Sequence, residues 1–426
     1  MSDPTKTTPE ATGRSTPGLD VATIRKDFPI LDQIQNGNRL VFLDSAASSQ
    51  RPRQVLAAMT DFYNTSYANV HRGVYQVAER ATNAYEHARL RVAQFIGADN
   101  ANEIVFTKNA TEALNLVAGS WGRANLGPGD AIVLTLLEHH ANIVPWQMLA
   151  AEKGFEIRWI PVTGDGRLDL SDLPRLLDGA KLVAFTSMSN VTGALTPSDQ
   201  IIAAARAAGA LTVVDACQSV PHLPTDVSEL GADFVAFSGH KMLGPTGIGV
   251  LWARHELLDA MPPFLGGGGM ILNVTTDGFL SDAPPAKFEA GTPPIAEAVG
   301  LAAAIDYLEQ VGMEAIREHE VSLTAYALRK LTSELGDDIT VHGPSEPAAR
   351  GGVLSIVLDG VHAHDVSQVL DEHAVCIRPG HHCAKPLMKV LGVPATARAS
   401  LYLYNDVDDI DALTESLKSA RDFFAL

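Results

Sequence analysis

The chain has 426 residues, 46% of them apolar, which is enough for two packed domains and a large core. The net charge of −18 argues against nucleic acid or an anionic membrane as a partner. Three cysteines are too few for a disulfide framework and fit a reducing compartment, so we expect a cytoplasmic protein.

The first residues, Met1 to Asp20, are rich in Thr, Pro, Ser and Gly and lack the apolar core of a secretion signal. This composition predicts a disordered tail over residues 1–20, with order from Val21. A short strand is expected over 40–44. The small-residue turn after it, which contains Ala46, either lets the backbone approach a ligand closely or is a plain turn.

A polar loop with His71 precedes a long amphipathic helix that we expect over 77–96. The strand Ile104–Phe106 is followed by a polar turn and a helix that starts near Ala110 and Thr111. A strand, a small polar turn and a helix start make a site for an anion. Simple capping of the helix explains the same residues equally well.

Four apolar runs that alternate with helical segments predict strands over 131–136, 181–186, 211–215 and 233–237. This pattern indicates an α/β fold with a parallel sheet buried on both faces. Ligands of such sheets lie beyond the carboxyl ends of the strands. Polar residues recur at those ends and predict one shared site: His139, Asn190, Asp215, Gln218, Ser238, His240 and Lys241.

A loop over 265–270 is expected to be flexible, and the helix predicted over 295–310 is expected to bridge to a second domain. We therefore predict a large domain over 21–294 and a small domain over 295–426. The small domain is expected to have strands over 352–358, 375–378 and 399–403, and helices over 365–372 and 407–424.

Lys241 stands after the last large-domain strand and before a Gly-rich stretch. A rigidly held, partly desolvated lysine can form a Schiff base with pyridoxal phosphate, although a surface lysine also fits this position. The cofactor also needs a carboxylate beside its ring nitrogen, a role that suits Asp215, unless this residue is a helix cap or a surface acid. Either His139 or His140 has the planar ring needed to stack on the cofactor.

Cys383 is the candidate nucleophile, because a thiol attacks as thiolate and positive neighbours favour that form. His381, His382 and Lys385 lie within two residues of it. A buried structural thiol and a metal site made with the two histidines are the alternatives. Cys217 and Cys376 are expected to be packed structural thiols. Arg398, expected just before a strand, suits a substrate carboxylate but also an ordinary salt bridge.

Ten motifs, spread from Leu43 to Asn405, carry a family resemblance. They are LDSAASSQRP from Leu43, NVHRG from Asn69, NATEALNLVA from Asn109, EHHANIVPWQ from Glu138, SNVTG from Ser189, DACQSVPH from Asp215, FSGHKMLGPTGIGVLW from Phe237, FEAGTP from Phe288, RPGHHCAKPLM from Arg378 and RASLYLYN from Arg398. In these motifs the chain resembles the SUF-type, or group II, cysteine desulfurases. These belong to the fold-type I pyridoxal-phosphate enzymes of the class V aminotransferase family. The resemblance implies a large domain with a mostly parallel sheet flanked by helices, and a smaller α+β domain that carries the cysteine loop.

The resemblance also implies a role for each matching residue. Lys241 would carry the cofactor and move protons, and His139 would stack and act as acid or base. The other cofactor contacts would be Asp215 at the ring nitrogen, Gln218 and Asn190 at the ring oxygen, and Ala110, Thr111, Ser238 and His240 at the phosphate. Gly291 and Thr292 would reach the phosphate in the partner subunit of an obligatory homodimer.

Arg398 would bind the carboxylate of L-cysteine, assisted by Arg378, His71 and Ala46. Cys383 would take the sulfur as a persulfide, release L-alanine and pass the sulfur to a SUF acceptor protein for iron–sulfur assembly. No resident metal is expected. His364 matches a histidine that some relatives use to engage a zinc-bound acceptor, although a histidine at a helix start explains it as well.

The sequence departs from the family pattern at Tyr75, Lys287, Pro294 and Lys385, which concerns the rim of the site. Two other functions stay open at this point. One is a related pyridoxal enzyme, namely a selenocysteine lyase, a cysteine sulfinate desulfinase or an aminotransferase. The other is a metal-binding or scaffold protein that uses His381, His382 and Cys383.

Overall fold

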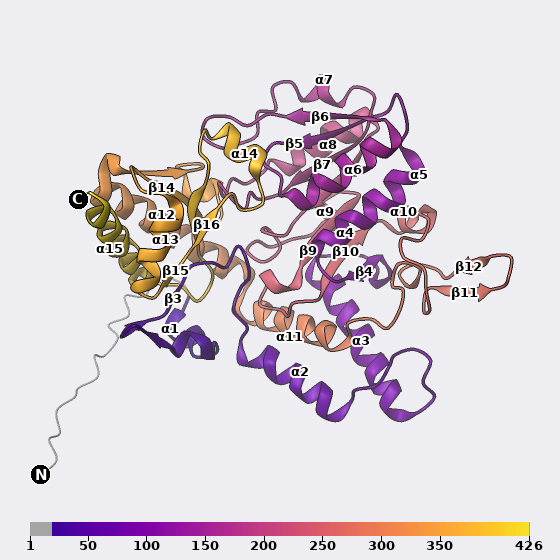
Figure 1. Ribbon diagram of the computed structural model, residues 1–426. Coiled ribbons are helices and arrows are strands. Elements are labelled where there is room, and N and C mark those ends of the chain that lie inside the picture. Colours follow the sequence, from indigo (N-terminus) through magenta and orange to yellow (C-terminus); the bar gives the residue numbers. More distant parts are fainter. Residues whose placement is uncertain (1–18, 426) are drawn as a thin grey trace, which may run out of the picture.

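The structure is a computed structural model that describes residues 19–425, so most of the expected disordered tail over 1–20 lies outside the described residues. Two lobes lie side by side (Figure 1). The larger lobe contains a seven-stranded sheet, and the smaller lobe, coloured orange and yellow, contains a four-stranded sheet. Among the described residues, no helix is long and apolar enough to cross a membrane.

The large sheet has the strand order β4-β10-β9-β8-β7-β5-β6. Its strands are β4 (Ile104–Thr107), β5 (Ala131–Thr135), β6 (Glu156–Ile160), β7 (Ala180–Thr186), β8 (Leu211–Asp215), β9 (Phe234–Ser238) and β10 (Gly249–Ala253). All strand pairs from β9 to β6 are parallel, whereas β10 runs antiparallel to β9 and to β4. The predicted α/β fold with a mostly parallel sheet is confirmed. Two strands, β6 and β10, were not predicted from the sequence; β10 begins inside the Gly-rich stretch that follows Lys241.

Helices cover both faces of the large sheet, because its strands are apolar on both sides. In β9, Phe234 and Ala236 belong to the core that includes α4 and α6, whereas Val235 and Phe237 belong to the core that includes α3, α8 and α11. The helices of this lobe are α2 (Arg53–Thr65), α3 (Gln76–Phe95), α4 (Ala110–Val117), α5 (Arg123–Asn125), α6 (Val144–Lys153), α7 (Leu173–Leu177), α8 (Ser198–Ala208), α9 (Val227–Leu230), α10 (His255–Ala260) and α11 (Ile295–Val311).

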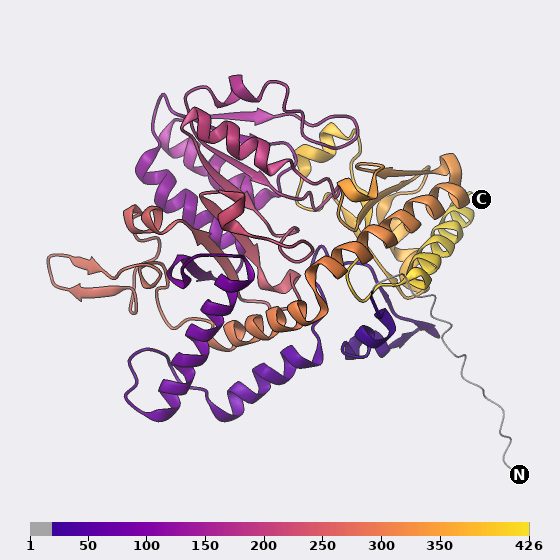
Figure 2. The same cartoon turned by 180° about the vertical axis from the view of Figure 1, so that it is seen from behind.

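Two consecutive helices connect the lobes (Figure 2). The first, α11, packs on α2 and α3, and its apolar residues join the core of the large lobe. The second, α12 (Met313–Leu335), packs on α15 (Val407–Phe424), and the residues from Leu323 to Leu335 join the core of the small lobe. The helix predicted over 295–310 is thus present, but it packs with the large sheet.

The sheet of the small lobe is antiparallel, with the order β13-β14-β17-β16. Its elements are β13 (Ile339–His342), β14 (Val353–Leu358), α13 (Ala363–Glu372), β16 (Arg378–Gly380), α14 (Lys385–Val390) and β17 (Thr396–Ser400). The strand predicted over 399–403 was placed too late, because the apolar residues after β17 are buried without forming a ladder. The run predicted as one strand over 375–378 is split, because the chain changes sheets at Ile377.

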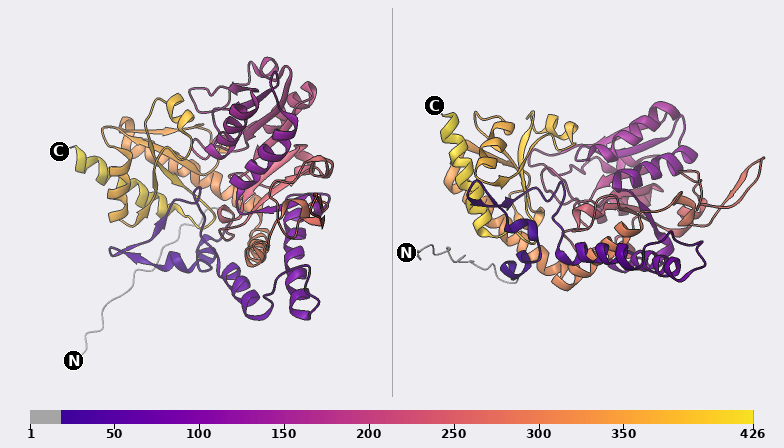
Figure 3. Two further views of the ribbon diagram at one scale, coloured as in Figure 1. Left: turned by 45° about the vertical axis from the view of Figure 1, so that its right-hand side comes forward. Right: turned by 60° about the horizontal axis from the view of Figure 1, so that its bottom comes forward.

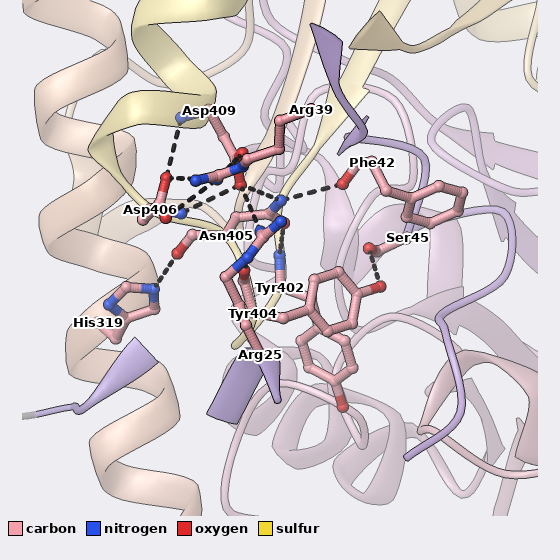
Figure 4. A network of polar contacts seen from close by, with 10 residues as sticks. All are labelled: Arg25, Arg39, Phe42, Ser45, His319, Tyr402, Tyr404, Asn405, Asp406 and Asp409. Atoms are coloured by element: carbon pink, nitrogen blue, oxygen red, sulfur yellow. Dashed lines mark hydrogen bonds and ion pairs between the residues drawn. The ribbon is translucent and has the colours of Figure 1, made fainter. Parts of the chain in front are cut away.

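The N-terminal segment packs on the small lobe. β3 (Val41–Phe42) pairs in parallel with β15 (Val375–Cys376), which leaves Asp44 and Ala46 at the junction of the lobes. A polar network anchors this segment (Figure 4). The buried carboxylate of Asp409 lies 3.3 Å from Arg25 Nη1 and 2.5 Å from Arg39 Nη2.

The described N-terminal segment also contains α1 (Val21–Arg25), β1 (Ile34–Gln35) and β2 (Asn38–Arg39). A hairpin of β11 (Ile271–Val274) and β12 (Phe279–Ser281) projects from the far end of the large lobe (Figure 3). Only the loop before this hairpin, over residues 265–270, was predicted from the sequence.

Candidate active site

A cavity of about 600 Å³ lies where the carboxyl ends of the large-sheet strands meet the small lobe. Thirteen of the residues that were predicted from the sequence as site residues line this cavity. They are Ala46, Ala110, Thr111, His139, Asn190, Asp215, Gln218, Ser238, His240, Lys241, Arg378, Cys383 and Arg398. The tertiary fold therefore collects side chains that are up to 352 positions apart in the sequence into one pocket.

Lys241 is positioned by a single turn of 3-10 helix, Gly239–Lys241, directly after β9. The amide of Met242 and the amide of Gly244 both donate to the carbonyl of Gly239, at 3.0 Å each. The carbonyl of His240 accepts from the amide of Ser49 at 3.0 Å. The backbone on both sides of Lys241 is thus fixed, as a covalent attachment point for a cofactor requires.

Asp215 ends β8, between β7 and β9. Its Oδ1 accepts a hydrogen bond from the amide of Cys217 at 3.0 Å. Cys217 itself lines the cavity, so the prediction of a merely packed structural thiol missed its place in the site. Its sulfur lies 4.0 Å from Ser238 Oγ, and burial together with the charge of Asp215 raises the pKa of the thiol far above its usual value. Cys217 is therefore a neutral thiol at physiological pH.

The start of α4 lies against the end of β9 and forms the polar end of the cavity. The amide of Ala110 donates to Ser238 Oγ at 2.9 Å, and Thr111 lines the pocket beside it. Gly249 makes this approach possible, because a Cβ at this position would lie 2.4 Å from Asn109 Cα. A helix N-terminus with two nearby hydroxyls is suited to a phosphate group.

His240 and His139 are held as neutral imidazoles. Burial, followed by the charge of Lys241, lowers the pKa of each to about 4. His139 Nδ1 accepts from the amide of Ala141 at 3.1 Å, which fixes the plane of its ring. Of the two adjacent histidines, His139 lines the cavity and His140 is not among the lining residues.

Behind His139 lies Glu138, a fully buried carboxyl that the sequence analysis did not single out. It accepts from Thr135 Oγ1 at 2.5 Å, Asn142 Nδ2 at 2.7 Å and the amide of Thr186 at 2.9 Å. These bonds tie the end of β5 to the end of β7. Burial raises the pKa of Glu138 to about 8 despite the three donors.

Gln218, Asn190 and Ala46 line the cavity between these groups. Gln218 Nε2 donates to the carbonyl of Ala46 at 2.8 Å, which joins the loop after β8 to the N-terminal segment. Asn190 Nδ2 donates to the carbonyl of His382 at 2.8 Å, which joins the loop after β7 to the cysteine loop.

Two arginines from the small lobe share one carboxylate. Arg398 lies inside β17, not before a strand as predicted, and its side chain is buried. Its Nη1 donates to the carbonyl of Asn190 at 3.0 Å, and its Nη2 lies 3.3 Å from Asp44 Oδ1. Arg378 Nη2 lies 2.9 Å from Asp44 Oδ2. Burial lowers the pKa of Arg398 to about 10, so it stays charged and the cluster has a net positive charge.

Cys383 lies exposed on a loop between β16 and α14, and it lines the cavity. His382 and Cys383 have φ values of 50° and 55°, in the left-handed region that side chains other than glycine seldom adopt. The ring of His382 is turned away into the small lobe, where its Nε2 lies 2.9 Å from Thr396 Oγ1. The strained backbone thus presents the thiol to the pocket and buries the neighbouring imidazole.

Three nominated residues lie elsewhere in this chain. His71 is exposed, and its Nε2 lies 2.8 Å from Glu86 Oε1. Thr292 lines a separate cavity with Lys108 and Phe264, and Gly291 adjoins it. Their predicted roles at this site remain predictions. His364, by contrast, lies at the rim of the active-site cavity, and its ring stacks on His362 at 5.3 Å.

Within residues 19–425, no three His, Cys, Asp or Glu side chains are placed so as to hold a metal ion. His381 faces His140, with ring centroids 5.9 Å apart, while His382 points to Thr396 and Cys383 to the cavity. Because these three side chains diverge, they do not form the ligand set that a metal-binding function needs.

The donor set of the cavity fits pyridoxal phosphate. The cavity offers an amine on a fixed turn, a carboxylate at a strand end, neutral imidazoles, and a helix start with hydroxyls that suits the phosphate. The absence of a side chain at Gly249 lets the start of α4 lie against the end of β9, which places Ala110, Thr111 and Ser238 together at one end of the cavity.

Known proteins agree with this assignment. The family model for aminotransferase class-V matches residues 41–413. A probable cysteine desulfurase of Streptomyces coelicolor is 52% identical over 96% of this chain and 99% of its own length. A cysteine desulfurase of Haloferax volcanii is 47% identical, over 96% and 98%.

Among solved structures, the apo cysteine desulfurase of Thermococcus onnurineus has a TM-score of 0.89 at 41% identity, covering 95% of this chain and 98% of that one. A cysteine desulfurase of Escherichia coli has a TM-score of 0.88 at 38% identity, covering 95% and 99%. The chain therefore belongs to the aminotransferase class-V family.

Proposed function

We propose that the protein is a pyridoxal-phosphate-dependent cysteine desulfurase, which converts L-cysteine to L-alanine and carries the sulfur as a persulfide on Cys383. The observation that carries the proposal is that Cys383 and Lys241, from different lobes, line the same cavity. The names of relatives that share about half of the sequence over nearly the full length support the same activity.

The residues that would hold the cofactor follow from the site. Lys241 would bind it covalently, Asp215 would pair with its ring nitrogen, and Gln218 and Asn190 would face its ring oxygen. The phosphate would lie at Ala110, Thr111, Ser238 and His240. When bound, pyridoxal phosphate supplies an electron sink that withdraws electrons from the substrate carbons.

The positive cluster of Arg398 and Arg378 would bind the carboxylate of L-cysteine, because two guanidinium groups face a single carboxylate of Asp44. Lys241 would take the proton from the substrate Cα and return one to the carbon skeleton, and His139 would lie against the reacting atoms. The thiolate of Cys383 would then attack the sulfur of the substrate.

In that transfer a bond forms between the sulfur of Cys383 and the sulfur of the substrate, and the bond between that sulfur and the substrate Cβ breaks. The electron pair of the broken bond stays with the carbon skeleton, where protons complete the methyl group of alanine. One cysteine and one enzyme thiol thus give one alanine and one persulfide, so no external oxidant or reductant is needed.

The finer assignments are part of the same proposal. The enzyme would act in the cytoplasm as a homodimer, with Gly291 and Thr292 reaching the partner's cofactor and His71 assisting at the site. The sulfur would pass to an acceptor protein of the SUF system for iron–sulfur cluster assembly. The exposed positions of Gly291, Thr292 and His71 in the single chain support a role for them at an interface.

The test uses holoenzyme and a Cys383→Ser variant, with alanine and protein-bound persulfide measured after addition of L-cysteine. Wild type should form both products, whereas the variant should keep the visible absorption of the cofactor and form no persulfide. Sulfur transfer that persists in Cys383→Ser would refute the role of this thiol. Selenocysteine and cysteine sulfinate in parallel reactions distinguish a selenocysteine lyase or a desulfinase, since these would turn over their substrates while L-cysteine is left intact.

A further inference from the structure

The cysteine loop is attached to the large lobe through one residue in particular, His140. The backbone amide of His140 donates to the carbonyl of Cys383 at 2.7 Å. Its ring Nε2 accepts from the amide of Lys385 at 3.1 Å. One residue of the large lobe therefore bonds the backbone at the nucleophile and again two residues after it.

Other contacts also keep this segment in place: His382 Nε2 lies 2.9 Å from Thr396 Oγ1, and the buried Leu387 and Met388 pack with Leu137 and Val191 of the large lobe. Asn190 Nδ2 donates to the carbonyl of His382 from the large lobe, and the amide of Ala384 donates to the carbonyl of His381 within the loop. The segment is also strained, because His382 and Cys383 both have positive φ values. A strained segment stays in such a conformation only when its surroundings hold it there.

We propose that His140 is a positioning residue, which holds the Cys383 segment against the large lobe and does so with a neutral imidazole. The neutral form is required because a protonated ring carries a hydrogen on both nitrogens and cannot accept from the amide of Lys385. The consequence for catalysis rests on the proposed function, whereas the attachment of the loop does not.

The charged neighbours of His140 favour the same protonation state. Burial lowers its pKa below the ordinary value, and the nearby His381 and Lys385 lower it further. The ring of His381 lies 5.9 Å away on the cysteine loop, and the ring of His139 lies 6.4 Å away on the same turn. The charged groups that shift this pKa, His381 and Lys385, are both basic and disfavour an imidazolium at His140.

The direction in which loop attachment changes with pH follows from the difference in proton binding by His140 between the attached and detached states. The attached loop favours neutral His140, whereas in the detached state the ring returns toward an ordinary pKa of about 6.5. The detached state therefore binds more protons, and attachment weakens as the pH falls below about 6.5, by at most roughly tenfold per pH unit. Above that pH the contribution of His140 is fully present.

The experiment compares wild type, His140→Gln and His140→Ala by hydrogen–deuterium exchange of residues 381–388 in the holoenzyme, at pH 8 and pH 5.5. The glutamine side chain keeps an acceptor oxygen but does not titrate. The alanine variant loses the acceptor and keeps the backbone donor. Each comparison is made between variants at the same pH, which cancels the intrinsic dependence of exchange on pH.

At pH 8 the glutamine variant should exchange like wild type, and the alanine variant roughly fivefold faster, as the loss of one hydrogen bond implies. At pH 5.5 wild type should approach the alanine variant while the glutamine variant remains protected. Equal protection of wild type and His140→Ala at pH 8, or the same response to pH in wild type and His140→Gln, would overturn the proposal.

Single-turnover sulfur transfer to Cys383 gives a second readout. His140→Ala should lower the single-turnover rate of persulfide formation at saturating L-cysteine. The KM for L-cysteine, measured separately at steady state, should stay within about twofold. His140→Gln should restore the single-turnover rate at pH 8. If wild type forms no persulfide at all, the proposed function fails, while the exchange data still decide the role of His140.

Discussion

Arg398 and Asp44 form an ion pair at the junction of the lobes, with Nη2 and Oδ1 3.3 Å apart. The two residues come from opposite ends of the chain, since Asp44 follows β3 and Arg398 lies in β17. Because Asp44 also binds Arg378, one carboxylate orients two guanidinium groups toward the cavity. The cluster of two arginines and one aspartate thus keeps a net positive charge beside the cavity, where a carboxylate substrate would bind.

An Arg398→Lys substitution should therefore weaken binding of L-cysteine. A lysine keeps the charge but loses the planar fork, and a hydrogen bond to a charged group is worth about 1.5–3 kcal/mol. We expect kcat/KM to fall roughly 10- to 150-fold, mostly through KM. Steady-state kinetics measure this effect, with Arg421→Lys on the exposed face of α15 as the matched control. An unchanged KM in Arg398→Lys would contradict the assignment.

His139 should act as a neutral group throughout the working range of the enzyme. Burial and the charge of Lys241 lower its pKa to about 4, so the ring is neutral above about pH 5. A His139→Gln substitution should lower kcat by roughly 10²- to 10⁴-fold, the usual contribution of an acid–base group. The factor should be the same at every pH from 6 to 8, because His139 does not titrate there. A pH–rate profile of both proteins checks this, and a factor that changes tenfold across the range would argue against a neutral His139.

Glu138 should make the folded state less stable as the pH rises. Burial raises its folded pKa to about 8, above the ordinary value of 4.5, so the folded state retains a proton that the unfolded state releases. Its contribution is fully present below pH 4.5 and is lost as the pH rises through about 8, by at most about 1.4 kcal/mol per pH unit. Urea unfolding of wild type and Glu138→Gln between pH 5 and 8 measures this slope.

The Glu138→Gln variant has nearly the same shape but cannot titrate, so its stability should depend less on pH in that window. It should also be less stable at pH 5, because its amide NH₂ would face the donor Asn142 Nδ2. Parallel pH curves for the two proteins would show that Glu138 is already ionised in the folded state at pH 5, which would contradict a raised pKa.

Asp409 should be important for the attachment of the N-terminal segment. Its carboxylate is fully buried and binds Arg25 and Arg39, so an Asp409→Asn substitution removes the negative charge that both guanidinium groups face and leaves Arg25 with no other carboxylate partner among the described residues, whereas Arg39 keeps its pair with Asp406 (Figure 4). We expect a loss of about 3–5 kcal/mol, as for a broken buried ion pair. The exposed pair of Asp338 and Arg421 provides the control, since Asp338→Asn should cost at most about 1 kcal/mol. Urea denaturation measures both, and equal losses in the two variants would refute the special role of Asp409.

Local sequence patterns predicted much of the large lobe. The apolar run of β7 (Ala180–Thr186) and the amphipathic helix α3 (Gln76–Phe95) lie within one residue of their predicted bounds. The strand is recognisable as a continuous apolar run because it is buried on both faces, and the helix is recognisable because its one buried stripe repeats apolar residues every three or four positions. The strand β10 was missed because it begins with the glycine that the close approach of α4 requires.

The chemistry of the site was also visible in the sequence, because polar residues at strand ends converge in any parallel sheet. Asp215 and Lys241 were nominated in this way, and they line one cavity. Glu138 was not predicted as a site residue, because its position beside two histidines in the sequence does not indicate that three hydrogen-bond donors surround its carboxyl group. The same holds for Asp44, whose two arginine partners are more than 330 positions away in the sequence.

The sequence by itself determined the class of fold and the reactive groups, because strand periodicity, the lysine turn and the Cys383 loop are local features. Only the tertiary structure decided which groups meet. The packing of the two lobes joins His140 to Cys383 and Asn190 to His382, and it places Glu138 in a dry interior where its pKa rises. Contacts between distant segments and the exclusion of water arise only when the whole chain is packed, and no local pattern encodes them.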